Sequence, residues 1–351
     1  MNNLGDLSTL LVWAAATAFT VALIAYAVDL ARLADNAQRR AADVPVPVAV
    51  GADGAPDDRV DVPVVAESAV LGSAAQVAPG RSARAEGIAR STTYLGLALL
   101  FAGIVLRGFA AGHWPTSNMY EFALVGTFVA VLVLAIVQRR RVIAFLGVVV
   151  MSIAVLLLVL ALNVFFVQAE ALRPALQNYW LVIHVGVAIT ATGVFTVAFA
   201  AAVLQLLRDA RETGRTRLGS PWRRADGLRR TFSGLAVTGR HFTWLEQVPD
   251  ARRLEALSFR LNAVGFVLWT LTLIGGAIWA EHAWGRYWGW DPKEVGTFVA
   301  WVVYAAYLHA RTTRGWSGRR AAYFVMVGYA VVIANFTIVN LVVTGKHSYA
   351  F

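Results

Sequence analysis

The chain has no cysteine among its 351 residues. A protein without thiols cannot carry out thiol–disulfide exchange, and it cannot supply the thiolates that hold an iron–sulfur cluster. Any metal chemistry must therefore come from its six histidines, from its carboxylates, or from a ligand that another molecule supplies.

Charged side chains are also scarce, at 15% of the residues, whereas 58% are hydrophobic and the mean hydropathy is +0.60. This composition excludes a soluble globular domain and is typical of a polytopic membrane protein. We predict an all-α integral membrane bundle of about eight transmembrane helices. The apolar runs lie at about 8–31, 92–111, 119–137, 142–166, 179–207, 261–280, 295–310 and 321–344. We expect the first run to be a retained span and not a signal peptide, since it has no basic region before it and no small-residue cleavage site.

The formal net charge of +10 is distributed unevenly along the chain. With the N-terminus and the C-terminus outside, the predicted inner segments are 32–90, 138–141, 208–260 and 311–320. They hold 26 of the 31 lysines and arginines. This distribution follows the positive-inside rule. We therefore expect a multi-pass protein of the cytoplasmic (plasma) membrane, whose basic loops contact anionic membrane lipid and no nucleic acid.

Residues 35–91 are rich in Ala, Val, Pro, Gly and Asp and lack a helical period. They predict a disordered cytoplasmic linker between an N-terminal anchor span, residues 1–34, and a membrane domain, residues 92–351. Residues 208–260 form a second, basic cytoplasmic loop, to which the sequence assigns no function.

The segment 284–294, Trp-Gly-Arg-Tyr-Trp-Gly-Trp-Asp-Pro-Lys-Glu, is the most distinctive part of the chain. Five of the twelve tryptophans lie between Trp279 and Trp301, and two glycines allow the segment to fold tightly with its indole rings side by side. Such a surface suits a flat apolar ligand, and nearby cations suit acidic groups on the rim of that ligand. A porphyrin with two propionates meets both demands. The predicted binding residues are Trp284, Arg286, Trp288, Trp290, Asp291 and Lys293. The alternative, an interfacial aromatic belt, explains one or two tryptophans beside a helix end but not this whole loop.

Two acidic residues match the pattern of a helix start. In Asp291-Pro-Lys-Glu294, aspartate is in the N-cap position, proline is at the first helical position and glutamate can reach back to the cap. Asn118 and Glu121 have the same spacing ahead of the third span. Both glutamates are compatible with a capping role, with a functional role, or with both.

Two histidines are expected at the same level of the membrane. Ionisable residues inside a membrane are costly and mark functional sites. His184 lies about one turn below the outer end of the fifth span, and His347 lies a few residues beyond the last span. An imidazole pair beside the tryptophan loop is what a six-coordinate haem iron needs. The alternative is two unrelated interfacial histidines that bond to the backbone.

His309 is predicted to lie near the inner side of the membrane. It follows Pro292 by 17 residues, which is roughly 25 Å along a helix, and Arg311 comes just after it. It is therefore too far from the tryptophan loop to ligate the same iron. It is either a packing residue or one ligand of an inner metal site whose other ligand is missing from this chain.

These motifs together resemble one family. Residues 284–294 look like the WWD domain of haem-handling proteins, and residues 113–121, 177–184 and 345–349 are similar to segments of the CcsA/ResC family of System II cytochrome c biogenesis. The resemblance covers about 92–351. It implies that His184 and His347 are the axial ligands of an outer haem and that His309 belongs to an inner haem site.

The resemblance also implies a function. Together with a ResB-type (CcsB) membrane partner, such proteins deliver haem b across the membrane to the extracytoplasmic face. There the haem is joined by thioether bonds to the Cys-x-x-Cys-His motif of apocytochrome c. The chain would be a subunit of a holocytochrome c synthase (haem lyase). Since it has no thiols, a separate thioredoxin-like protein must keep the thiols of the apocytochrome reduced. Haem is the cargo, and positioning it is the main contribution that the protein can make.

Two other classes remain open from the sequence. A di-haem b-type electron carrier usually has paired histidines on one helix, and none of the spans predicted here has two. A solute transporter predicts broken helices and charges near the membrane centre, whereas these spans are almost free of charge at their centres.

Overall fold

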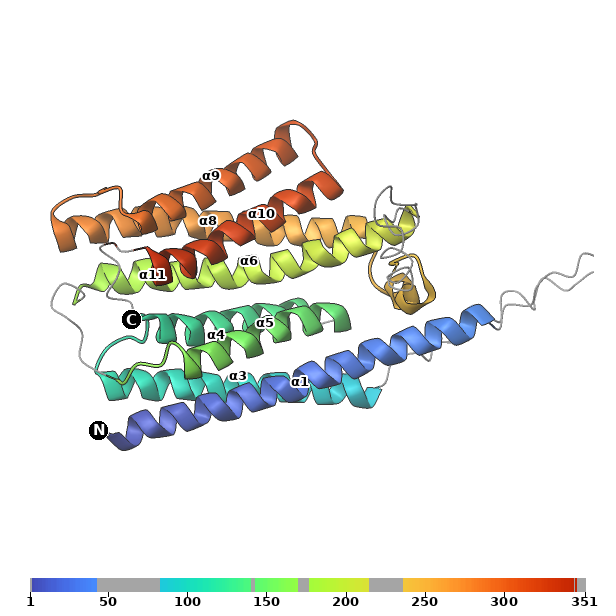
Figure 1. Cartoon of the computed structure of the whole chain (residues 1–351), viewed down its shortest axis with the longest axis horizontal. Helices are drawn as coiled ribbons and strands as arrows, with labels where there is room; N and C mark the ends of the chain where they lie inside the picture. Colours follow the sequence, from blue (N-terminus) through green and yellow to red (C-terminus); the bar gives the residue numbers. More distant parts are fainter. Residues whose placement is uncertain are drawn as a thin grey trace, which may run out of the picture.

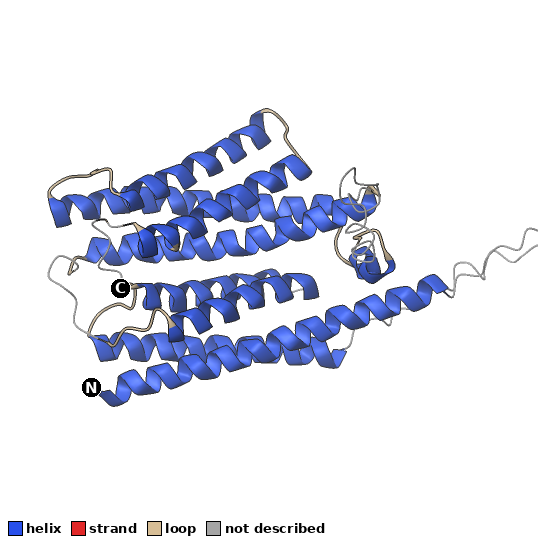
Figure 2. Ribbon diagram, in the orientation of Figure 1, coloured by secondary structure: helices blue, strands red, loops and turns tan. Residues whose placement is uncertain are grey.

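The computed structural model describes residues 2–42, 83–139, 143–169, 177–214, 236–343 and 345. Within these ranges every regular element is a helix, as Figure 2 shows. The long helices are α1 (Asn2–Ala42), α3 (Ala83–Ala111), α4 (Met119–Val137), α5 (Ala144–Asn163), α6 (Tyr179–Glu212), α8 (Ala251–Trp284), α9 (Pro292–Thr313) and α10 (Arg319–Phe336). Two short helices, η4 (Arg240–Gln247) and α11 (Ile338–Val342), complete the described elements.

The predicted all-α, polytopic fold is confirmed. Seven helical stretches of the described chain are long and apolar enough to cross a membrane, with α10 and α11 forming one stretch. An eighth helix, α9, falls at a predicted span. It has 22 residues, about 33 Å of helix, but it is less apolar than the other seven.

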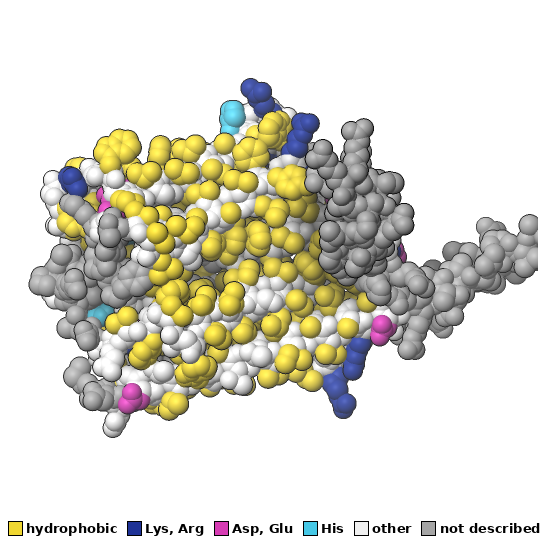
Figure 3. Space-filling view, viewed as in Figure 1, with side chains coloured by type: hydrophobic (Ala, Val, Ile, Leu, Met, Phe, Trp, Pro, Cys, Tyr) yellow, Lys and Arg dark blue, Asp and Glu magenta, His cyan; other side chains and the backbone are white. Residues whose placement is uncertain are grey.

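The helices run up and down the bundle, so alternate connections meet at the same end (Figure 1). One end, called the site end below, holds the start of α1, the α3–α4 connection at 112–118 and the α8–α9 loop at 285–291. The sequence predicts this convergence. Figure 3 shows hydrophobic side chains over the middle of the bundle, with charged side chains towards its ends. That pattern is expected for a surface that faces lipid.

The first span is not the appended anchor that the sequence predicts. Phe19 and Tyr26 of α1 are buried in the same apolar cluster as Leu100 of α3 and Met151 of α5. Phe19 lies directly over Gly96 of α3, where the missing side chain allows the two helices to approach closely. α1 is therefore an integral part of the bundle.

The predicted linker also needs a correction at both ends. α1 continues to Ala42 and α3 begins at Ala83, so parts of 35–91 are helical, and 43–82 lies outside the described residues. Arg90 pairs with Glu86 one turn earlier, at 3.3 Å. Such pairs support a helix beyond its apolar stretch, and the apolar run alone gives no sign of this extension.

Two buried clusters flank α6, the 34-residue helix at the centre of the fold. One cluster is formed mainly by α1, α3, α4 and α5, and the other by α6, α8, α9 and α10. Phe195 of α6 stacks on Tyr304 of α9 in the second cluster, with ring centroids 4.0 Å apart. The candidate site lies between these clusters, at the site end.

The described part of the basic segment 208–260 is folded against the end of α6 opposite the site end. Arg211 donates to Glu246 of η4, and Arg208 donates to the carbonyl oxygen of Leu245 at 2.7 Å. Residues 215–235 of this segment lie outside the described residues.

Candidate functional site

His184 lies in the second turn of α6, which begins after the N-cap Asn178. Its Nδ1 is 2.8 Å from the carbonyl oxygen of Thr272 on α8. Because a carbonyl oxygen only accepts, Nδ1 carries the proton, and the lone pair is then on Nε2. Metal-ligating histidines are commonly oriented in this way by a backbone carbonyl.

The ring of His184 is also held from the side. It lies parallel to the buried indole of Trp279, with centroids 6.2 Å apart and an interplanar angle of 7°. A Cβ atom placed on Gly276 would lie 2.7 Å from Cε1 of His184, so only glycine leaves room for the ring at this position. A Cβ atom on the adjacent Gly275 would lie 3.5 Å from the Cα atom of His184, which is an ordinary van der Waals contact. The sequence analysis did not identify Trp279, Gly276 or Thr272 as site residues.

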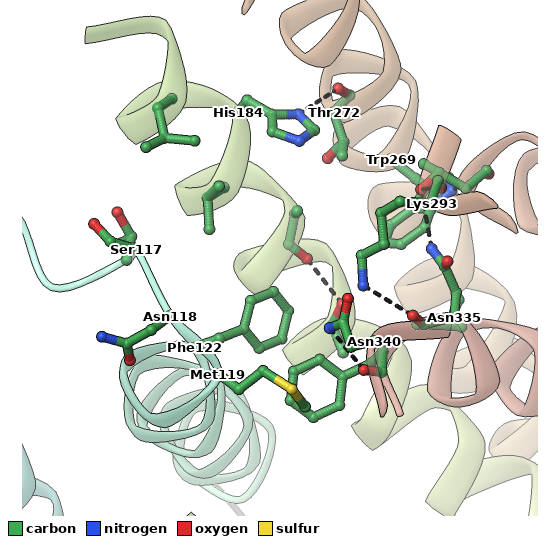
Figure 4. Close-up of a pocket in the computed structure, with 18 residues that line it drawn as sticks. Ser117, Asn118, Met119, Phe122, His184, Trp269, Thr272, Lys293, Asn335 and Asn340 are labelled. Atoms are coloured by element: carbon green, nitrogen blue, oxygen red, sulfur yellow. Dashed lines mark hydrogen bonds between the residues drawn. The ribbon is translucent and has the colours of Figure 1, made fainter. Parts of the chain in front are cut away.

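A cavity of about 120 Å³, called the site pocket below, lies beside His184 (Figure 4). Its walls come from the α3–α4 connection and from α4, α6, α8, α9, α10 and α11. Lys293 extends into this region, and its Nζ donates to the carbonyl oxygen of Asn335 at 2.8 Å. The amide of Asn335 donates in turn to Thr297 at 3.0 Å. The Lys293 side chain therefore lies inside the site pocket and not at its mouth.

A second, smaller space of about 50 Å³ lies on the tryptophan side of the same ring. Trp284 and Trp288 line it together with Trp279, and His184 and Lys293 line both spaces. The structure thus gathers four of the predicted residues at one place: His184, Trp284, Trp288 and Lys293.

The tryptophan rings around the site cross one another at steep angles. Trp288 and Trp290 are nearly perpendicular, at 85°, and Trp279 and Trp284 cross at 67°. Trp290 has a left-handed backbone, with φ of 58°, and its side chain is 78% exposed. A non-glycine residue in that conformation is unusual and marks a constrained turn. Trp290 lines neither space, whereas Trp284 and Trp288 line the smaller one.

The predicted helix start at Asp291 is confirmed. The Asp291 carboxylate accepts from the backbone of α9, and the Glu294 carboxylate accepts from the backbone N–H groups of Gly289 (2.8 Å) and Asp291 (3.1 Å). Arg286 is exposed, and its guanidinium lies over Gly289, where a Cβ atom would be 2.5 Å from Nη2. Asp291 and Arg286 therefore shape the loop, and neither of them lines the two spaces.

The α3–α4 side of the site is held by a buried ion pair. Arg107 of α3 and Glu121 of α4 are 3% and 0% exposed, and Arg107 Nε lies 3.1 Å from the Glu121 carboxylate. Glu121 also accepts from the backbone N–H of Ser117, and Arg107 donates to the carbonyl oxygen of Gln168. Asn118 caps α4 as predicted, accepting from the N–H of Glu121. Glu121 therefore has a role beyond capping.

Of the other two predicted iron ligands, the structure describes only His309. His347 is outside the described residues. Gly345, two positions earlier, lies against the start of α9, where a Cβ atom would be 2.7 Å from the Asp291 carboxylate. His309 is exposed on α9, near its end opposite the site end, so the structure separates it from His184.

The fold and the site define a polytopic helical membrane protein with a histidine- and tryptophan-lined pocket at one end of its bundle. The family model described as "Cytochrome C assembly protein" matches residues 116–347. Two relatives named "Cytochrome c biogenesis protein CcsA" are each 35% identical to the chain. The one from Prochlorococcus marinus (strain MIT 9303) aligns over 72% of this chain and 81% of its own length. The one from Synechococcus sp. (strain WH7803) aligns over 78% and 88%. The chain belongs to the CcsA family of cytochrome c assembly proteins, and its function is in cytochrome c maturation.

The fold is also similar to a solved structure, "Cytochrome c Heme Lyase CcmF", with a TM-score of 0.53 and 16% sequence identity. That match covers 98% of this chain but 48% of the other chain. The helical arrangement of this chain therefore corresponds to about half of that larger protein.

Proposed function

We propose that this chain holds haem b at the site end and presents it for thioether attachment to the Cys-x-x-Cys-His motif of apocytochrome c. The observation that carries the proposal is the setting of His184. Its Nδ1 bonds to the Thr272 carbonyl oxygen, and its ring lies between two adjoining spaces lined by tryptophan and by Lys293. A neutral imidazole held in this way is a suitable axial ligand for iron.

Haem is the substrate here, and the residues around His184 fit its parts. The indoles of Trp284 and Trp288 supply aromatic surface for the porphyrin, and the Lys293 ammonium supplies a partner for one propionate. His347 is the proposed second axial ligand, since Gly345 already lies against the start of α9. The two spaces, about 120 and 50 Å³, are small for a porphyrin. Binding therefore requires outward movement of the loop at 285–291.

The reaction adds each thiol of the apocytochrome across one vinyl group of haem, forming a C–S bond. The sulfur bonds to carbon, and the thiol proton goes to the other vinyl carbon, so no oxidant is consumed. Both thiols belong to the apocytochrome, because this chain has no cysteine. The enzymatic role proposed for the chain, as a haem lyase subunit, is to orient the vinyl groups towards those thiols.

The remaining parts of the proposal concern supply and location. His309 serves an inner haem site with a ligand from a ResB/CcsB-type partner, and its exposed position on α9 leaves the ring accessible to a neighbouring chain. The protein lies in the cytoplasmic membrane with its site end outside, which is supported by the sequence, since 26 of the 31 basic residues fall in the predicted inner segments. A thioredoxin-like reductant keeps the apocytochrome thiols reduced.

Replacement of the two proposed ligands tests this function. His184→Gly and His347→Gly, expressed with the partner and an apocytochrome, should each abolish cytochrome c maturation, and millimolar imidazole should partly restore it. The readouts are the covalent haem stain of the cytochrome and a pyridine haemochrome assay of the purified complex. His282→Gly is the matched control, since His282 is at the site end but lines neither space. Full maturation by the His184→Gly, His347→Gly double variant without imidazole would refute the ligand assignment.

A further inference from the structure

A third cavity, of about 180 Å³, lies deeper in the bundle between α4, α5, α6 and α10. We call it the lateral cavity. Its lining includes Ala130 of α4 and Ala154 of α5, which lie near the middle of their helices. The lateral cavity is therefore at the level of the hydrocarbon core when these helices span a membrane.

The lateral cavity is lined almost entirely by apolar groups. The hydroxyls of Thr192, Thr196 and Thr337 each donate to the carbonyl oxygen one turn earlier in their own helices. These hydroxyls therefore leave few unsatisfied hydrogen-bonding groups in the cavity. The hydroxyl of Thr127 has no hydrogen-bond partner among the described residues.

The lateral cavity reaches the outer surface of the bundle. Leu156 of α5 lines it and is 61% exposed. The opposite wall is formed by Tyr329 and Ile333 of α10. α5 and α10 lie in different halves of the bundle in Figure 1, and the surface over this region is largely hydrophobic in Figure 3. The mouth of the cavity thus faces the region that lipid would occupy.

A thin aromatic wall separates the lateral cavity from the site pocket. Phe122, Thr192 and Phe336 line both spaces. The rings of Phe122 and Phe336 are stacked at 4.6 Å, and Phe165 meets Phe336 edge-on at 6.4 Å. The two cavities therefore share this wall, so a molecule in the lateral cavity contacts side chains that also line the site pocket.

We propose that the lateral cavity binds an acyl chain of a bilayer lipid. Hydrocarbon is the solvent at this depth, and an empty apolar cavity forfeits the dispersion contacts that a chain would supply. An apolar protein cavity of about 150 Å³ is known to accept a benzene-sized guest, so 180 Å³ accommodates a short length of acyl chain. The chain enters beside Leu156 and ends against Phe336. The proposal does not depend on what the site pocket binds.

Photo-crosslinking with a phosphatidylcholine that has a diazirine in its acyl chain tests the proposal. The full-length protein in nanodiscs is irradiated, digested and analysed by mass spectrometry. Crosslinks are expected at 150–160 of α5 and at 329–337, which covers the last turns of α10 and Thr337 after it, above the level on the exposed face of α4 at Leu132. Equal labelling at Leu132 and at the cavity would overturn the proposal.

Variants that fill the lateral cavity with a larger side chain provide a matched comparison. Ile153→Trp places a large ring in the lateral cavity and should abolish the cavity crosslinks, whereas Ile136→Trp adds the same ring on exposed α4 surface and should leave them intact. Ala154→Leu is a smaller filling variant in case Ile153→Trp does not fold, as judged by thermal unfolding. Retention of the crosslinks in a folded filling variant would refute the assignment. Their displacement by stoichiometric haem would assign the cavity to the porphyrin and overturn the acyl-chain proposal.

Discussion

The imidazole of His184 and the indole of Trp279 are parallel to within 7°, with their centroids 6.2 Å apart. Together with the bond from Nδ1 to the Thr272 carbonyl oxygen, this contact fixes both the tilt and the rotation of the imidazole. Both restraints come from α8. The position of the His184 ring, the proposed ligand on α6, is therefore set by how closely α8 approaches, and this approach depends on Gly276.

Gly276→Ala should displace the His184 ring, because the new Cβ atom would lie 2.7 Å from Cε1. Overpacking of this kind typically costs about 1–3 kcal/mol, less than is needed to unfold a large bundle. We expect less haem per purified complex in a pyridine haemochrome assay, with little change in protein abundance. Gly186→Ala is the control, since a Cβ atom there has no neighbour within 4 Å. Equal haem content in both variants would show that the orientation of His184 does not matter.

Trp288→Ala should reduce the haem retained by the complex while membrane insertion stays intact, because Trp288 lines the tryptophan side of His184. Trp316→Ala is a matched control, since Trp316 has similar intermediate burial but lies in the α9–α10 connection, opposite the site end. Trp269 is unsuitable as a control, although the sequence places it inside a span, because it lines the site pocket. A similar loss of haem at Trp288 and Trp316 would indicate general destabilisation.

Lys293→Gln should weaken haem binding about 10- to 100-fold, as expected for the loss of a charge-assisted hydrogen bond of about 1.5–3 kcal/mol. The glutamine amide can still donate to the carbonyl oxygen of Asn335, so the link between α9 and α10 has a replacement. Arg286→Gln removes a charge from the exposed loop surface and should have a much smaller effect. Haem titration followed by absorbance measures both. A larger effect at Arg286 would assign the propionate contact to the loop.

His309→Ala should deplete haem at the site end as well as at the inner site, if supply from the inner site precedes attachment. The His184→Gly variant, by contrast, should still load haem at the inner site. Imidazole supplied to cells should partly restore maturation in His309→Ala, since the role proposed for the lost group is that of an axial ligand. Normal haem occupancy in His309→Ala with the partner present would show that His309 has a packing role only.

The sequence predicts those features that depend on local patterns. Apolar runs of about twenty residues locate the spans, and the spacing of Asp291 and Glu294 predicts a capping box that the structure shows. Because the spans alternate in direction, their order also predicts which connections meet at the site end.

The features that the sequence analysis missed depend on which side of a helix faces which neighbour. In an almost wholly apolar span, the pattern does not reveal the buried side, so Trp279 and Thr272 could not be placed beside His184. The Gly275-Gly276 pair was the available signal, because small residues in a span mark close helix contacts. The orientation of each indole was also out of reach of the sequence, because it depends on backbone conformation: Trp290 has a left-handed backbone and an exposed ring.

The Arg107–Glu121 pair makes the α3–α4 side of the site more rigid than the side formed by the loop at 285–291. Breaking a buried ion pair costs about 3–5 kcal/mol, and this pair also holds the Ser117 and Gln168 backbones. The loop at 285–291 has exposed rings at Tyr287 and Trp290, and it is held to α9 by backbone hydrogen bonds to the Glu294 carboxylate. If the site holds haem as proposed, the loop at 285–291 is therefore the side expected to move when haem binds, and α3 and α4 are the side expected to stay in place.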